Sequence, residues 1–267
     1  MSRSIAHSTA LMASGTAVSR VAGMVRLALL GAAIGVGTAA ANTFDIANTL
    51  PSFFYAILAE GVLNAVLVPQ IVRAFSRGQG EEYVHRLLSV GTLVLGGLTA
   101  LLTLTAAFWV ALFSSANWSA EQRGLGAVFA YWCLPQVFFY GLYALWSQVL
   151  NARRVFGAVM WAPLANNLVS IAGFAVFIVV FGRYDPAAGG GLGTWGGGKI
   201  ALLAGTATVG IVAQALILLA PLARAGLRPR WRWGWRGFGL GRAARMTGWT
   251  AASLLFSQGA MALAIRL

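Results

Sequence analysis

The sequence has little of the chemistry that soluble enzymes use. Its 267 residues include one cysteine, two histidines and six acidic residues, and only 9% of them are charged. The lone Cys133 excludes a disulfide framework and a cysteine metal site, and His7 and His85 lack metal-ligand spacing. No Walker loop or dinucleotide fingerprint is present. We therefore expect no catalytic residues, no metal and no cofactor.

Apolar residues dominate instead, at 59% of the sequence, with a mean hydropathy of +0.77. A water-soluble enzyme is excluded by this composition. Because about 20 apolar residues cross the hydrocarbon layer, and a β-barrel would show short alternating segments, the sequence predicts an all-α polytopic membrane protein. About seven spans are expected, at residues 5–34, 43–72, 87–113, 124–150, 158–182, 200–222 and 246–267.

The first two expected spans are unusual because they contain charges and prolines. The N-terminal stretch resembles a signal peptide in having Arg3 before an apolar run, but it lacks a clean apolar core and a cleavage site. We expect it to form one span that contains Arg20 and Arg26. The second span contains Pro51 and Pro69, which predict a kinked or broken helix.

Positive charge is abundant, with 19 basic residues against 6 acidic ones. If the N-terminus is cytoplasmic, thirteen of the 19 basic residues lie in cytoplasmic segments, whereas the external connections hold only Arg123, Arg183 and Lys199. By the positive-inside rule this asymmetry predicts a cytoplasmic N-terminus in a multi-pass protein of the cytoplasmic membrane.

The cytoplasmic connection at residues 224–245 alternates tryptophan with arginine. Tryptophan favours the headgroup level and arginine attracts anionic lipids. We expect Trp231, Trp233 and Trp235 to anchor this connection at the membrane surface. Nucleic-acid binding is a weaker alternative, because the segment lies between two spans.

Charges inside spans are the main functional candidates, since each costs about 3 kcal/mol on insertion scales. Arg20 and Arg26 lie about 9 Å apart along a helix and about 120° apart around it. They could line one broad cavity, and guanidinium groups are well suited to binding phosphate or pyrophosphate. Alternatively, Arg26 pairs with Asp45 or Glu60 as a structural contact while Arg20 extends to the interface.

Small residues surround the two arginines. Gly15, Ser19 and Gly23 recur at every fourth position, which favours close packing of another helix more than direct contact with a ligand.

The acidic candidates lie in the second span. Asp45, near Asn42 and Pro51, could bind a coupling ion, act as a gate latch or face water at the interface. For Glu60 we expect a counter-ion role beside an arginine rather than a proton relay.

Several motifs together resemble one family. Residues 19–26, Ser-Arg-Val-Ala-Gly-Met-Val-Arg, resemble the first-helix signature of the MurJ (MviN) family of proposed lipid II flippases. Residues 47–51, 59–61 and 68–69 are similar to its second-helix pattern, and residues 150–156, 162–167 and 221–226 to its later connections. The resemblance extends over the whole chain in order.

The resemblance implies an exporter fold of about fourteen helices in two lobes that works by alternating access. This chain would supply the N-terminal lobe, residues 1–223, and the first helix of a truncated second lobe, residues 246–267. Arg20 and Arg26 would bind the pyrophosphate of lipid II, and the membrane potential or an ion gradient would drive transport. Anionic lipids and cell-wall synthesis or division proteins are the implied partners, with no nucleic acid.

Two positions depart from the family pattern and resemble an actinobacterial variant. Asn42 follows Ala41 where many members have an acidic residue, and Tyr55 stands where an arginine is often found. Two alternatives remain at this stage. One is an exporter of another undecaprenyl-linked glycan, or of drugs, although arginines count against cationic drugs. The other is a non-transporting membrane scaffold for cell-wall enzymes.

Overall fold

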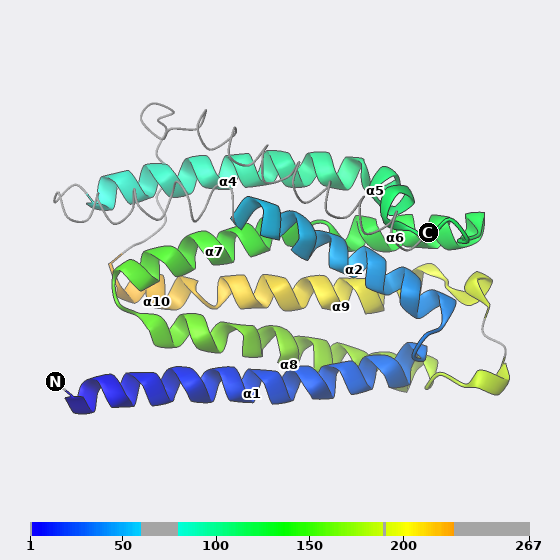
Figure 1. Cartoon of the computed structure of the whole chain (residues 1–267), viewed down its shortest axis with the longest axis horizontal. Coiled ribbons are helices and arrows are strands. Elements are labelled where there is room, and N and C mark those ends of the chain that lie inside the picture. Colours follow the sequence, from blue (N-terminus) through cyan, green and yellow to red (C-terminus); the bar gives the residue numbers. More distant parts are fainter. Residues whose placement is uncertain (1, 60–79, 189–190, 227–267) are drawn as a thin grey trace, which may run out of the picture.

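The computed structural model describes residues 2–59, 80–188 and 191–226, and these form helices joined by short connections (Figure 1). The helices are α1 (Ser2–Ile34), α2 (Ala39–Leu58), α4 (Gly80–Leu104), α5 (Ala106–Phe113), α6 (Ala120–Cys133), α7 (Gln136–Ala152), α8 (Phe156–Phe181), α9 (Gly197–Leu216) and α10 (Leu219–Arg224). Two 3-10 turns, η2 (Pro186–Ala188) and η3 (Leu192–Thr194), lie between α8 and α9.

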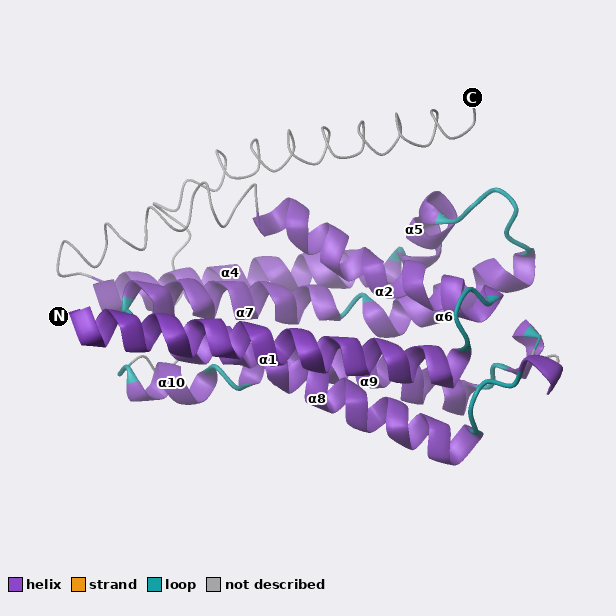
Figure 2. Cartoon of the chain, turned by 60° about the horizontal axis from the view of Figure 1, so that its bottom comes forward, coloured by secondary structure: helices purple, strands orange, loops and turns teal. Residues whose placement is uncertain are grey.

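The long helices lie side by side (Figure 2), and the sequence colours of Figure 1 show that they alternate in direction along the chain. Contacts between α1 and α8 show that these two run in parallel, since Gly15 faces Trp161 and Gly23 faces Asn167. In contrast, α4 and α7 are antiparallel, because Gly91 meets the side chain of Leu145 whereas Leu95, further along α4, meets the earlier Gly141. We call the end where α1, α5 and α8 finish the distal end, and the opposite end, which includes the N-terminus, the proximal end.

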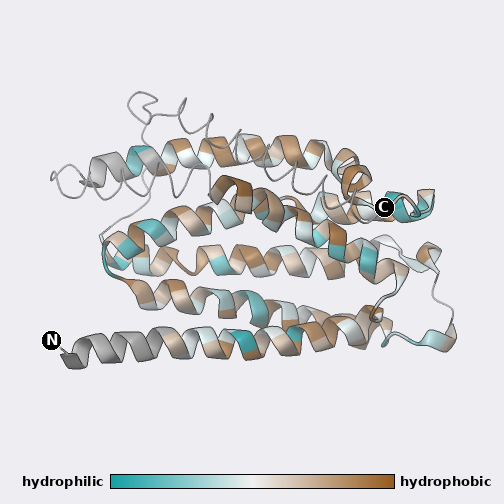
Figure 3. Cartoon of the chain, in the orientation of Figure 1, coloured by the Kyte–Doolittle hydropathy of each residue, from teal (hydrophilic) through white to brown (hydrophobic). Residues whose placement is uncertain are grey.

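The architecture is that of a multi-pass membrane protein. Among the described residues, four helical stretches are long and apolar enough to cross a membrane, and a bent pair would make a fifth. Figure 3 shows apolar residues along the lengths of the helices, as contact with lipid requires. The four stretches are Ala13–Ile34, Ala120–Ala152, Phe156–Phe181 and Gly197–Arg224, and the bent pair is Leu88–Leu104 with Ala106–Phe113.

The second helix differs from its expected bounds. It begins at Ala39 rather than at residue 43, because the hydroxyl of Thr38 caps it by accepting a hydrogen bond of 3.0 Å from the backbone N–H of Ala41. It then continues through Pro51, which is buried inside the helix, so the helix is not broken there, and a kink at Pro51 stays a prediction. The rest of the expected span, including Glu60, lies outside the described residues, as do Trp231, Trp233, Trp235 and the expected last span.

Three expected spans are interrupted. The span at residues 87–113 bends by 67° at Thr105, between α4 and α5. The Thr105 hydroxyl donates to the carbonyl of Leu101 at 2.8 Å and accepts from Nε1 of Trp109 at 2.9 Å, so it satisfies polar groups at the bend. Interruptions also separate α6 from α7, beside Pro135, and α9 from α10.

Side chains satisfy the backbone at the interruption between α6 and α7. Proline has no N–H and cannot continue the helical hydrogen bonds. The hydroxyl of Thr208 on α9 donates to the carbonyl of Trp132 at 2.7 Å. The amide Nε2 of Gln136, which is 1% exposed, donates to Oγ1 of Thr208 at 3.1 Å and to Oδ1 of Asn48 at 3.2 Å. One polar network therefore joins α2, α6, α7 and α9.

We expect Thr208→Val to lower the free energy of unfolding by about 1–3 kcal/mol, because it leaves the Trp132 carbonyl without its donor. The measurement is thermal unfolding in detergent, followed by reaction of a thiol dye with Cys133, which is the single cysteine and is fully buried. Thr99→Val is the matched control. The buried Thr99 hydroxyl has no hydrogen-bond partner in the described part of the chain, so its replacement should be neutral or stabilising. Equal losses in both variants would contradict the role assigned to Thr208.

Candidate functional site

The core consists of two apolar clusters with a polar layer between them. The distal cluster includes Phe44 and Phe129, and the proximal cluster includes Leu145 and Leu222. Polar side chains occupy the intervening stretches of α7, α8 and α9. We define the polar layer by the residues Gln136, Tyr140, Asn166, Asn167, Ser170, Thr208 and Gln214. Because polar groups inside a membrane are costly, this layer is the natural place for a functional site.

The first helix packs on α8 at this layer. The Nδ2 amide of Asn167 donates to the carbonyl oxygen of Ser19 at 2.8 Å and to its hydroxyl at 3.1 Å. A Cβ atom added to Gly15 would lie 2.8 Å from Nε1 of Trp161, which is too close for any side chain. At Gly23 an added Cβ would lie 3.8 Å from Asn167. The small residues of α1 therefore lie at the contact with α8.

Arg26 lies at the edge of the polar layer. It is half-buried, and its Nε atom is inaccessible and has no hydrogen-bond partner. Its charge is close enough to the hydroxyl of Tyr140 on α7 to interact with it electrostatically. Within the described residues Arg26 forms no ion pair, so the alternative of a counter-ion at Asp45 is not realised. An inaccessible guanidinium nitrogen without an acceptor is suited to an anionic ligand.

The structure separates the two arginines of the first helix. Arg20 is exposed, whereas Arg26 is half-buried, as their positions on different faces of the helix imply. Arg20 also lies about 9 Å nearer the proximal end. Of the two, Arg26 is the one whose charge interacts with a residue of the polar layer, Tyr140.

A stacked pair of tyrosines includes Tyr140, the residue with which the charge of Arg26 interacts. The ring of Tyr55 on α2 stacks on that of Tyr140 on α7, with centroids 5.4 Å apart and an interplanar angle of 27°. Sequence reasoning noted Tyr55 only as a departure from a family pattern and did not identify Tyr140. Tyr140 lies in an aromatic stretch of α7, so no local signal distinguishes it from lipid-facing aromatic residues.

The other candidates of the second helix lie away from this cluster. Asn42 and Asp45 are exposed near the distal start of α2, and Pro51 is buried against neighbouring helices. The structure therefore does not bring Asp45 to Arg26. In the residues that the structure describes, no group of three His, Cys, Asp or Glu side chains could hold a metal ion.

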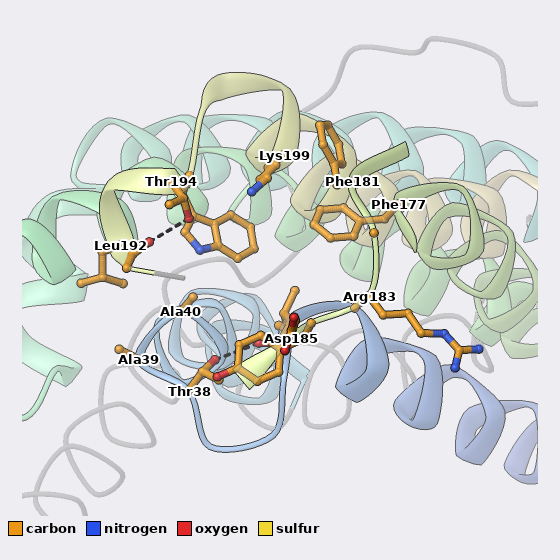
Figure 4. Close-up of a pocket in the computed structure, with 16 residues that line it drawn as sticks. Thr38, Ala39, Ala40, Phe177, Phe181, Arg183, Asp185, Leu192, Thr194 and Lys199 are labelled. Carbon is orange, nitrogen blue, oxygen red and sulfur yellow. Dashed lines mark hydrogen bonds between the residues drawn. The ribbon is translucent and has the colours of Figure 1, made fainter. Parts of the chain in front are cut away.

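A separate pocket of about 310 Å³ lies at the distal end, between the α1–α2 turn, the end of α8 and the start of α9. In Figure 4 the Lys199 side chain points into this pocket and that of Arg183 points away from it. The carboxylate of Asp185 accepts a hydrogen bond of 2.9 Å from the backbone N–H of Ala187. Ile34 of α1 lines this pocket. The pocket therefore lies about 12 Å from Arg26 along the axis of α1. Its charges are mixed, and it is distinct from the polar layer.

The chain is similar in sequence to known transporters. The family model "Lipid II flippase MurJ" matches residues 30–267. A relative from Synechocystis sp., named a probable lipid II flippase MurJ, is 29% identical over 232 residues, which is 85% of this chain and 41% of the relative. One of the same name from Vibrio cholerae is 25% identical over 248 residues, covering 88% of this chain and 44% of the relative. The chain thus spans less than half of these proteins.

Solved structures show the same fold. A lipid II flippase MurJ in an inward closed conformation has a TM-score of 0.65 at 17% identity, with 93% of this chain and 48% of that chain covered. A MOP superfamily transporter from Pyrococcus furiosus has a TM-score of 0.61 at 18% identity, covering 94% and 52%. The family match begins after Arg20 and Arg26, so the role of these arginines rests on the geometry described above. Because the match extends over most of the sequence, the chain belongs to the MurJ family of lipid II flippases.

Proposed function

We propose that this chain is the N-terminal lobe, with the first helix of the second lobe, of a transporter that carries lipid II across the bacterial cytoplasmic membrane for cell-wall synthesis. The observation that carries the proposal is Arg26, an arginine with an inaccessible, unpartnered Nε atom at the polar layer of a chain of this family. Its guanidinium would bind the pyrophosphate of the substrate.

The distribution of charge supports a cytoplasmic proximal end. Among the described residues, the acidic groups at the proximal end lie at the start of α4. The charged groups of the other described connections at this end are basic. At the distal end, basic and acidic residues are mixed, as Arg123 and Lys199 are with Glu121 and Asp185. By the positive-inside rule the N-terminus would be cytoplasmic. The basic segment after α10 would then contact anionic lipids of the inner leaflet.

The helices have features that suit alternating access. Short side chains between α1 and α8, the proline inside α2 and the bend at Thr105 are places where helices can shift or rotate. We propose that the membrane potential or an ion gradient drives this change, with lipid II bound at Arg26 beside the polar layer.

The test measures binding and transport of fluorescent lipid II by the 267-residue chain in proteoliposomes. Transport is scored as the fraction of the fluorescent lipid that becomes inaccessible to a membrane-impermeant quencher. We expect lipid II to bind and an undecaprenyl-linked O-antigen-type lipid to bind more weakly. Binding without translocation would show that this lobe holds the substrate but needs the rest of a transporter. Preference for the O-antigen-type lipid would favour the glycan-exporter alternative, and no binding of either lipid would favour the scaffold.

A further inference from the structure

We propose that Tyr55 and Tyr140 complete the anion site of Arg26, with their hydroxyl groups donating hydrogen bonds to the pyrophosphate oxygens of the lipid substrate. This inference rests on the proposed function and names two further residues of the same site. Three observations support it. They are the position of the stacked pair, the lack of a hydrogen-bond partner for either hydroxyl among the described residues, and the contrast with Tyr143, whose hydroxyl has a partner.

The pair lies where α2 and α7 meet, since each helix supplies one of the two rings. Tyr140 belongs to the polar layer and lies within electrostatic range of Arg26, and it holds Tyr55 by ring stacking. Because the rings are held by each other, a phosphate bound at Arg26 would meet hydroxyls that are already positioned. Such preorganisation lowers the entropic cost of binding.

The two hydroxyls are unpartnered within the part of the chain that the structure describes. Neither Tyr55 nor Tyr140 forms a side-chain hydrogen bond with any residue that the structure describes. Tyr143, one helical turn along α7, behaves differently, because its hydroxyl donates to the carbonyl of Val159 at 3.0 Å. Buried tyrosine hydroxyls usually find a partner. Within the described residues the half-buried pair therefore presents two unpartnered donors, and the Arg26 guanidinium interacts electrostatically with one of them, Tyr140.

The set of donors fits a diphosphate better than a monophosphate. Arg26 supplies a cationic donor fork from α1, and the tyrosines supply neutral donors from α2 and α7. A diphosphate is longer than a single phosphoryl group, so one of its phosphoryl groups can bind Arg26 while the other accepts from the hydroxyls, whereas a monophosphate bound at Arg26 reaches less far. Neutral donors also add hydrogen bonds without adding charge, so the ligand is held without the strong binding that a second arginine would give.

The experiment measures binding of farnesyl pyrophosphate, farnesyl phosphate and farnesol to the 267-residue chain in phosphatidylcholine nanodiscs. The double variant Tyr55→Phe, Tyr140→Phe keeps both rings and removes both hydroxyls. We expect it to bind farnesyl pyrophosphate about tenfold more weakly, as expected for hydrogen bonds to a charged group, and to lose the preference over farnesyl phosphate. Tyr143→Phe is the matched control, and its affinity should stay unchanged. Circular dichroism and protection of Cys133 from a thiol dye confirm folding.

Two results separate this inference from the function on which it rests. If Arg26→Gln abolishes binding but the double phenylalanine variant binds like wild type, the tyrosine assignment is overturned and the arginine site stands. If wild type does not bind farnesyl pyrophosphate, or binds it independently of Arg26, the anion site itself fails and the tyrosine assignment fails with it. An equal loss of farnesol binding would also overturn the inference, because farnesol has no phosphate.

Discussion

Arg26→Gln is expected to weaken lipid II binding by about a hundredfold, because it removes charge-assisted hydrogen bonds from a site of low dielectric. Glutamine keeps a side chain of similar reach but neither the charge nor the planar donor fork. Arg26→Lys keeps the charge, and we expect an intermediate loss, because an ammonium group cannot bind phosphate through two parallel donors. Affinity for fluorescent lipid II in nanodiscs is the measurement.

The matched controls are two other arginines of the same chain. Arg20→Gln changes an exposed arginine of the same helix, and we expect a smaller loss than at Arg26. Arg123→Gln changes an exposed arginine at the distal end, where its Nη2 donates to the carbonyl of Ala116 at 3.2 Å. This variant should bind like wild type. Equal losses in all three would show that general positive charge, rather than a site at Arg26, attracts the lipid.

Gly173→Leu is expected to destabilise the folded lobe by about 3 kcal/mol, the upper part of the usual range for overpacking. Here α8 and α9 approach so closely that a Cβ at Gly173 would overlap the side chain of Thr206. Gly210→Leu should act similarly, since an added Cβ there would meet the side chain of Asn166 and lie 3.1 Å from its carbonyl oxygen. Both changes would force the helices apart, and small residues are what permit such contacts in membranes.

Gly97→Leu is the control for both glycine variants. Gly97 lies in α4, is exposed, and has no atom within 4 Å of an added Cβ. Its thermal midpoint in the Cys133 labelling assay should match that of wild type. If Gly173→Leu and Gly97→Leu unfold at the same temperature, the close approach of α8 and α9 does not determine stability.

The helices that charges and prolines delimit could be predicted from the sequence, and those that break inside apolar runs could not. The expected spans at residues 5–34 and 158–182 correspond closely to α1 and α8, because glycines of positive φ follow α1 and Arg154 and Arg183 flank α8. The bend at Thr105 lies inside an uninterrupted apolar stretch. An apolar stretch of this composition is compatible with lipid whether the helix is straight or bent. Packing against neighbouring helices therefore determines whether it bends.

The candidate site shows the same limit. A charge in an apolar run pointed to Arg20 and Arg26 together, since the cost of burial does not depend on which face of the helix carries the charge. The structure distinguishes them, because Arg20 is exposed whereas Arg26 is half-buried and interacts electrostatically with Tyr140. Tyr140 itself lies on a distant helix. Its role depends on a tertiary contact with Tyr55, and no local pattern encodes that contact.

The central claim is that the pyrophosphate of lipid II binds at Arg26, between α1, α2 and α7. Its most direct test is photocrosslinking of this chain in nanodiscs to lipid II that carries a diazirine beside the pyrophosphate, with the attachment sites identified by mass spectrometry. The account predicts attachment to α1 around Arg26 and to α7 around Tyr140, with loss of both in Arg26→Gln. Attachment confined to the distal pocket around Lys199, or to the outer face of α4, would contradict it.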